Sequence, residues 1–492
     1  MAFTGRTFAW AFVAMLAVEL LALAVFFSPI ARTSALLVVV LAFLILALRR
    51  LDLAFLVMTG ELVVGSQGHL LDLSFHGLVL SLRMAFFVVL FCVWLARRIQ
   101  AKDLPFRTSP FFGSTMAFLA VVVLGIAIGL VRGNNVQDVY LDANAFLFLV
   151  LAPLIMEQVK DRRQISRVIQ VIMAGMVFLA LQSLVLLAVF SHGSTYLPEI
   201  YRWVRDSRLY EINRIASNFF RIFSQAQFFS LPALLLLLVA SMSGGFPAKN
   251  TTRFLLGLAT LIVVLVSFSR SFWLALALAG VIAVPWAAKR LGCSWKRFAR
   301  ISAAGVTLVV LALLVISFAA NFPYLWNRPG GQHTLALLEE RTTDTQEAAA
   351  GSRYALFGPL TRAALRHPVL GSGFGTAVTY ATKDPHFVDV AGGVRTTYAF
   401  EWGYLDLWLK TGILGLGVVI LFLVAVVRTL CAAWKSSPAD RWLLAWMLLS
   451  VLVLVVTHAL TPYLNHPIGL FLLLLAAATG EGVLHKSVES TT

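Results

Sequence analysis

Long apolar runs follow one another along this chain, and they constrain its fold more than any other feature. Many are long enough to cross the roughly 30 Å of hydrocarbon in a bilayer. They predict spans near residues 8–28, 33–48, 52–65, 77–96, 111–131, 140–156, 168–190, 228–243, 254–268, 272–288, 302–320, 405–427, 442–458 and 466–483. The 33–65 and 254–288 pairs are short, so tilted hairpins or partly re-entrant elements are expected there. Hydrophobic residues are 60% of the chain and charged residues 13%, which excludes an ordinary soluble enzyme.

The predicted fold is therefore an all-α polytopic membrane protein with about 12–14 transmembrane helices. Basic residues cluster in alternate loops: Arg49–Arg50, Arg97–Arg98–Lys102–Arg107, Lys160–Arg162–Arg163–Arg167 and Lys289–Arg290–Lys296–Arg297–Arg300. The positive-inside rule then places both termini in the cytoplasm. Only Arg6 precedes the first span and no small-residue cleavage site follows it, so this span is predicted to be a retained anchor. The net charge of +16 is interpreted partly as charge facing membrane lipids, and no nucleic-acid partner is predicted.

Arginine is concentrated on the predicted outer face, where the positive-inside rule does not place it. The residues are Arg202, Arg205, Arg208, Arg214, Arg221, Arg270, Arg328, Arg341, Arg353, Arg362, Arg366 and Arg395. Guanidinium groups bind phosphate bidentately and keep their charge, so an anionic ligand is expected there. Arg202, Arg205 and Arg208 are interpreted as interfacial anchors. Arg270 lies between two apolar segments with almost no loop, where a charge is costly unless paired or bound, so a functional role is predicted.

The chain is expected to have three parts: spans in 1–320 with an outer Arg-rich segment at 191–227, a large outer loop or lid at 321–404, and C-terminal spans in 405–492. Within the loop, one helix is predicted from Thr334 to Glu347 and a second from Gly351 to His367. The run from Gly371 to Gly375 follows. It is interpreted as a helix-ending turn, or as a place where the backbone approaches a ligand closely.

Several short motifs, taken in their order along the chain, resemble those of the O-antigen ligase and O-antigen polymerase superfamily, bacterial inner-membrane glycosyltransferases of the GT-C type. The resemblance covers about the C-terminal half: Asn213-Arg214 to Gln227, Ser269-Arg270-Ser271, Gly351-Ser352-Arg353, His367-Pro368-x-x-Gly371-x-Gly373-x-Gly375 and Lys410-Thr411-Gly412-Ile413-Leu414-Gly415. It implies transfer of a glycan from an undecaprenyl-diphosphate carrier to a hydroxyl of a glycan or glycolipid acceptor on the periplasmic side, without a cofactor or metal. It also implies diphosphate binding by Arg214 or Arg221, by Arg270 and by Arg353.

One departure concerns the general base. Family members commonly carry a His-Asn pair before the helix that follows the large loop, whereas residues 398–406 here contain no His. Glu401 is predicted to accept the proton of the acceptor hydroxyl, with Asp406 second. Alternatively, Glu401 pairs with Lys410 or a loop arginine, and Arg353 pairs with Glu347 or Glu339. The departure points to an uncommon polymerase or ligase branch.

Other polar residues leave several readings open. His458, His466 and Tyr398 are candidates for lining a cavity at the outer mouth, and no metal-ligand spacing is recognisable at this face. The charges expected within the membrane, Glu19, Glu61, Arg83 and Asp142, suggest function, or in the case of Glu61 and Arg83 a buried pair. The alternative function is a transporter or flippase of an anionic lipid-linked glycan. The oligomeric state stays open.

Overall fold

The computed structural model describes residues 3–75, 78–194, 196–216, 219–243, 249–322, 348–382 and 393–489. Within these ranges, eleven helices are long and apolar enough to cross a membrane, and Asn250–Val266 is a shorter apolar helix. The predicted all-α polytopic membrane fold is confirmed. The helix predicted from Thr334 to Glu347 lies outside the described residues, whereas the helix predicted from Gly351 is present as α16 (Ala348–Arg366).

The chain folds into two compact units, each built from separate segments. The first contains Met1–Asp103, Gln158–Arg341 and Arg441–Leu449, and the second contains Leu104–Glu157, Thr342–Asp440 and Ser450–Thr492.

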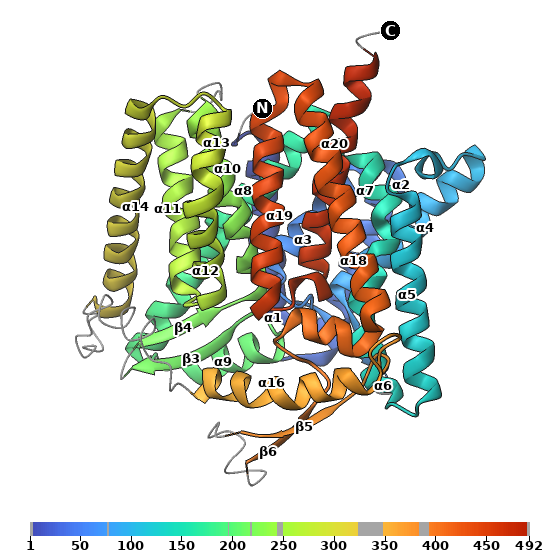
Figure 1. Ribbon diagram of the computed structural model, residues 1–492. Coiled ribbons are helices and arrows are strands. Elements are labelled where there is room, and N and C mark those ends of the chain that lie inside the picture. The colour runs from blue at the N-terminus through green and yellow to red at the C-terminus, as the bar shows by residue number, and fades with distance from the viewer. Residues whose placement is uncertain are drawn as a thin grey trace. The chain divides into compact units, whose positions relative to one another are not determined.

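In the first unit, the N-terminal part comprises α1 (Arg6–Val25), α2 (Pro29–Arg49), α3 (Leu51–Val64) and α4 (Leu82–Ala101). The 31-residue α8 (Arg162–His192) packs on α1, α3, α11 and α14. Asp161 begins α8 by accepting the Gln164 N–H, and Gly193 ends it with a φ of 61°. The remaining elements are α9 (Leu197–Asp206), α10 (Ser230–Ser243), α11 (Asn250–Val266), α12 (Arg270–Leu278), α13 (Val284–Arg290), α14 (Trp295–Asn321) and the first half of α19 (Arg441–Leu460) (Figure 1).

In the second unit, α18 (Gly403–Ser436) packs on α5 (Phe112–Val131), α20 (Pro467–Glu489) and α16. The apolar run predicted near 140–156 is a composite of α6 (Val136–Ala143), a 3-10 segment (Asn144–Leu151) and α7 (Ala152–Gln158). Helix α16 lies across the end of α18 and packs a buried cluster of Leu356, Leu360 and Ala364 against Phe400 and Leu409 (Figure 1).

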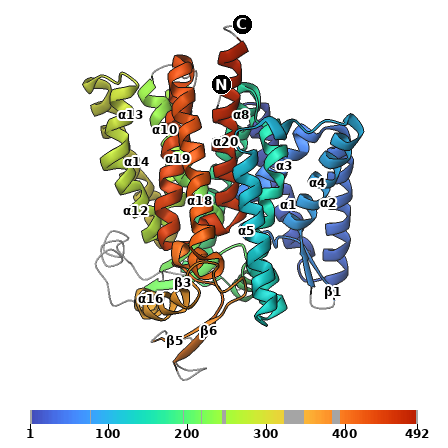
Figure 2. The ribbon, with the colours of Figure 1, turned by 45° about the vertical axis from the view of Figure 1, so that its right-hand side comes forward.

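Three short hairpins, which the sequence did not indicate, interrupt the helices in the described ranges. They pair β1 (Asp72–Phe75) with β2 (Leu78–Ser81), β3 (Glu211–Ala216) with β4 (Phe219–Phe223), and β5 (Val378–Ala381) with β6 (Val394–Thr397), all antiparallel. The first hairpin lies at the ends of α2 and α4 (Figure 2). Strands β3 and β4 lie within the outer Arg-rich segment predicted at 191–227.

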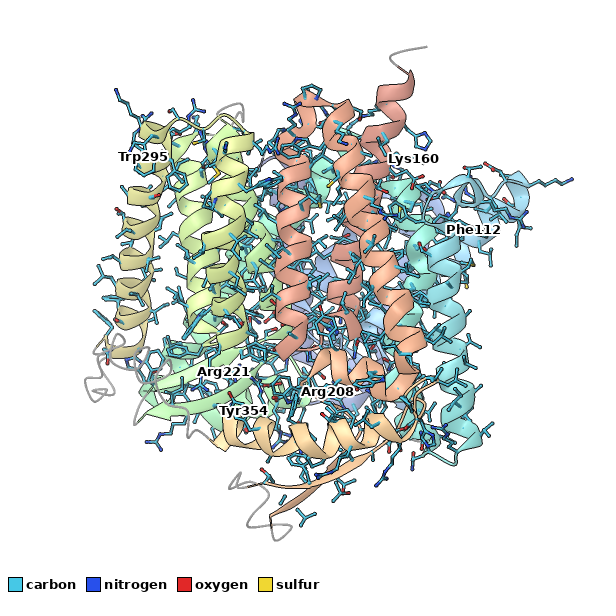
Figure 3. All side chains as sticks on the ribbon, viewed as in Figure 1. Phe112, Lys160, Arg208, Arg221, Trp295 and Tyr354 are labelled. Carbon is cyan, nitrogen blue, oxygen red and sulfur yellow. The ribbon has the colours of Figure 1, made fainter. Side chains whose placement is uncertain are left out.

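In the first unit, the loops assigned to the cytoplasm and the arginines assigned to the outer face lie at opposite ends of the helices. Lys160 and Trp295, in the loops assigned to the cytoplasm, lie at one end of its helices, and Arg208 and Arg221 lie at the opposite end (Figure 3). This placement agrees with the alternation of loops read from the sequence.

Candidate functional site

The β3–β4 hairpin meets the turn between α11 and α12, and the contacts come from alternate residues of β4. Phe219 and Phe223 make edge and tilted ring contacts with Phe268 and Phe272 at centroid distances of 5.4 and 6.1 Å. Arg221, between them, donates from Nε to the carbonyl oxygen of Ser267 at 2.8 Å. Because side chains alternate along a strand, these three residues share one face of β4, and that face contacts the turn.

Arg221 and Arg270 therefore approach the same short turn, since Ser267 lies three residues before Arg270. The guanidinium of Arg221 also lies 4.4 Å from the Phe223 ring centroid, in a cation–π contact. Arg270 begins α12 and is half-buried. Phe268 in the turn has a φ of 46°, which residues other than glycine rarely adopt.

The register separates the two arginines between which the sequence left a choice. Asn213 is opposite Arg221, and Arg214 is opposite Phe220. Arg214 is exposed and belongs to the face of the hairpin on which Phe220 contacts Phe190 of α8. The hairpin thus brings Arg221, and not Arg214, to the turn that carries Arg270.

In the second unit, Arg353 of α16 forms an ion pair with Glu401, and the Trp402 indole N–H donates to the Arg353 carbonyl at 3.0 Å. The partner of Glu401 is thus a loop arginine, one of the alternatives the sequence left open. Both side chains of the pair remain accessible, at 35% and 54% exposure. Such a pair contributes at most about 1 kcal/mol to stability, so the fold does not depend on it.

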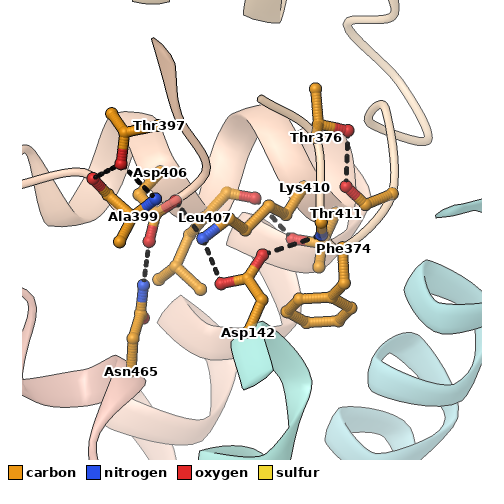
Figure 4. Close-up of polar contacts among 12 residues, drawn as sticks. Asp142, Phe374, Thr376, Thr397, Ala399, Asp406, Leu407, Lys410, Thr411 and Asn465 are labelled. Atoms are coloured by element: carbon orange, nitrogen blue, oxygen red, sulfur yellow. Dashed lines mark hydrogen bonds and ion pairs between the residues drawn. The ribbon is translucent and has the colours of Figure 1, made fainter. Parts of the chain in front are cut away.

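Asp406, the second candidate base, lies in a buried charge cluster that the sequence did not reveal (Figure 4). Lys410 Nζ is 2.5 Å from Asp406 Oδ1, one helical turn away, and 2.5 Å from Oδ1 of Asp142 on α6. The amide of Asn465 donates to Asp406 Oδ2, and the Gly375 N–H donates to Asp142 Oδ2 at 2.9 Å. This arrangement leaves Asp406 occupied on both oxygens and favours a structural role.

The glycine run after His367 packs against the chain's own helices. Gly412 has a φ of 68° and a ψ of −174°, which interrupts α18. The loop seals the interruption: the N–H groups of Ile413 and Leu414 donate to the carbonyls of Pro368 and Val369, and the N–H groups of Ser372 and Gly373 donate to those of Leu409 and Lys410. A Cβ at Gly373 would lie 2.2 Å from the backbone nitrogen of Gly129 on α5. The close approach expected of these glycines is therefore made to protein backbone.

The three candidates for lining a cavity have different surroundings. His458 is buried, accepts the Leu464 N–H on Nδ1 at 3.1 Å, and packs edge-on against Tyr404. His466 accepts the Ile468 N–H at 3.2 Å and so caps the start of α20. Tyr398 is half-buried just after β6. The His458 imidazole also packs against Gly403, the first residue of α18.

Of the charges expected within the membrane, Arg83 and Glu61 form the buried pair that was one of the alternatives, with bonds of 2.8 and 3.0 Å. Glu19 is buried on α1. Asp142 belongs to the cluster with Lys410.

Residues 255–420 match the family model described as O-Antigen ligase. The matched segment contains Arg270, Arg353, Glu401 and Lys410, whereas Arg214 and Arg221 precede it. A comparison with curated proteins finds no match. The family resemblance read from the motifs is confirmed: this multi-pass membrane protein matches the O-antigen ligase family model over residues 255–420.

Proposed function

We propose that the protein is a glycosyltransferase of the bacterial inner membrane, which moves a glycan from an undecaprenyl-diphosphate carrier to an acceptor hydroxyl at the periplasmic face. The observation that carries the proposal is the meeting of Arg221 with the turn before Arg270, at the start of the segment that matches the O-antigen ligase family. Lipid-linked glycans are the general substrates of that family.

The chemistry explains the need for arginine. The anomeric carbon–oxygen bond to the diphosphate breaks, a bond to the acceptor oxygen forms, and undecaprenyl diphosphate leaves with the electron pair. Negative charge therefore grows on the leaving group. Arg221 and Arg270 are proposed to stabilise that charge, because guanidinium groups fixed before the reaction need no reorganisation during it. Arg214 and Arg353 are proposed as weaker contributors to diphosphate binding.

The acceptor hydroxyl must lose its proton as it attacks. Glu401 is the proposed general base, because its side chain is accessible at 54% exposure. Asp406 is the less favoured candidate, since Lys410 and Asn465 occupy its oxygens.

The experiment compares Glu401→Gln with Glu199→Gln in purified protein supplied with a lipid-linked glycan donor and an acceptor. Glu199 is an exposed carboxylate on α9 and serves as the matched control. The Glu401 variant should lose roughly 10²–10⁴-fold in rate, the usual range for a general base, and keep its melting temperature. The control should keep both. Full activity in Glu401→Gln would remove this residue from the mechanism.

The same assay separates transfer from transport, because a flippase of lipid-linked glycans would form no new glycosidic bond. The glycan profile of a deletion strain then distinguishes two kinds of transfer. Loss of the polymer ladder with single repeats retained identifies a polymerase, and accumulation of long lipid-linked polymer identifies a ligase.

A further inference from the structure

A pocket of about 390 Å³ opens beside the β3–β4 hairpin, entirely within the first unit. Its size falls within the range of small-molecule sites, about 300–1,000 Å³. Tyr201 and Arg205 of α9, Arg208, Glu211, Asn213 and Gln67 line it. Arg205 and Arg208, which were interpreted from the sequence as interfacial anchors, line this pocket.

Several polar side chains of the pocket are not hydrogen-bonded or ion-paired to other described residues. The side chains of Arg208, Glu211 and Asn213 make no hydrogen bond or ion pair with other residues in the described ranges. Arg208 and Glu211 carry opposite charges in one pocket and yet do not pair. By contrast, the neighbouring Tyr210 is already committed: burial raises the pKa of its phenol, which donates to Gln182 Oε1 at 2.6 Å.

Backbone strain points to the same place. In the described chain, four residues other than glycine have φ in the left-handed region: Ser66, Lys102, Arg208 and Phe268. Ser66 and Arg208 line the pocket, and Phe268 follows Ser267, whose carbonyl oxygen accepts from Arg221. Left-handed backbone costs a residue with a side chain roughly 1–2 kcal/mol, and such strain gathers at functional sites.

Arg208 is the clearest case. It follows the end of α9, where its N–H donates to the Arg205 carbonyl and the next N–H donates to that of Val204. Glycine is the usual residue at this helix-ending position. The φ of Arg208, 51°, therefore suits glycine better than arginine. The backbone does not explain why this residue is an arginine, which points to a role for its side chain.

The pocket also adjoins the proposed diphosphate site. Glu211 and Asn213 are opposite Phe223 and Arg221 in the hairpin register, so these four residues share one face. Directly opposite residues in an antiparallel pair lie about 5 Å apart. A ligand in the pocket would thus lie next to the group held by Arg221.

We propose that this pocket binds an acidic sugar unit of the glycan, a step that rests on the proposed glycosyltransferase function. Arg208 binds the carboxylate of the sugar, because guanidinium and carboxylate match in a two-bond fork. Glu211 accepts hydrogen bonds from sugar hydroxyls, and the amides of Asn213 and Gln67 both donate and accept hydrogen bonds. The pocket thereby selects glycans by the sugar close to the carrier.

The test measures binding alone, with full-length protein in neutral detergent and saturation-transfer NMR. The probes are methyl β-D-glucuronide, methyl β-D-glucoside and glycerol 1-phosphate. Arg208→Gly removes the side chain at a position where glycine suits the backbone. Arg202→Ala is the matched control, because Arg202 is an exposed arginine of the neighbouring α9 that does not line the pocket.

Wild type and Arg202→Ala should bind the glucuronide more strongly than the glucoside. Arg208→Gly should bind the glucuronide at least tenfold more weakly, with a melting temperature no lower than that of wild type. The proposal is overturned if wild type does not bind the glucuronide, or if Arg208→Gly binds it equally. Binding of glycerol 1-phosphate without binding of the glucuronide would assign the pocket to a lipid headgroup, and would also overturn it. Because no turnover is measured, these outcomes are independent of whether glycan transfer is found.

Discussion

Replacing Lys410 with methionine should destabilise the second unit strongly. Its ammonium is 2% exposed and lies 2.5 Å from carboxylate oxygens of both Asp142 and Asp406. Methionine fills a similar volume but leaves these two carboxylates without their cation. Removing one partner of a buried ion pair costs about 3–5 kcal/mol. At about 2–4 °C per kcal/mol for a chain segment of this size, the melting temperature should fall by roughly 10 °C.

The assay is thermal unfolding in detergent, followed by tryptophan fluorescence. Lys435→Met is the matched control, because Lys435 is exposed near the end of the same helix. Adding Asp142→Asn to the Lys410 variant should recover part of the loss, since it removes one of the two unpaired charges. A Lys410→Met protein that melts with wild type, or a double variant that melts lower still, would refute the reasoning about this cluster.

Three further outcomes are expected. Arg270→Lys should lower kcat/KM roughly 10–100-fold although the charge is kept, because a two-bond guanidinium contact is lost, and near-normal turnover would count against diphosphate binding. Gly412→Ala should destabilise the protein, since its Cβ would lie 2.0 Å from the Val369 carbonyl oxygen, whereas Gly417→Ala, in open space on the same helix, should be neutral or stabilising; equal melting temperatures would contradict this. Transfer should persist in EDTA, because guanidinium groups are proposed to take up the leaving-group charge, and loss of activity restored by a divalent ion would argue against that role.

The membrane fold was predictable because each span can be recognised from its own stretch of sequence. Apolar runs mark the helices, and basic loops mark their alternation, so neither depends on distant contacts. The turn at Arg270 was predicted for the same reason: a charge between two apolar segments is visible without a structure. The β3–β4 hairpin was not, because its two short strands lie in a segment read only for its arginines.

The buried cluster could not be predicted, because Asp142 and Lys410 meet only through the packing of α6 against the rest of the second unit. Asp142 stands out in the sequence as a charge in an apolar run, but the sequence does not indicate which residue pairs with it. The role proposed for Arg208 could not be read from the sequence for another reason. An arginine near a span end reads as an anchor, and only its left-handed backbone shows that it occupies a position suited to glycine.

The interruption of α18 at Gly412 also bears on how the chain enters the membrane. The residues after it, 413–436, extend about 36 Å as a helix, enough to cross the bilayer without the preceding turns. The unpaired N–H groups at the break, on Ile413 and Leu414, find acceptors only when the segment at Pro368 and Val369 has docked. Unsatisfied backbone groups are costly in lipid, so the first turn after Gly412 is stabilised by this docking. The start of this membrane helix therefore depends on a loop that is synthesised before it, because the hydrogen bonds at the break join the two segments.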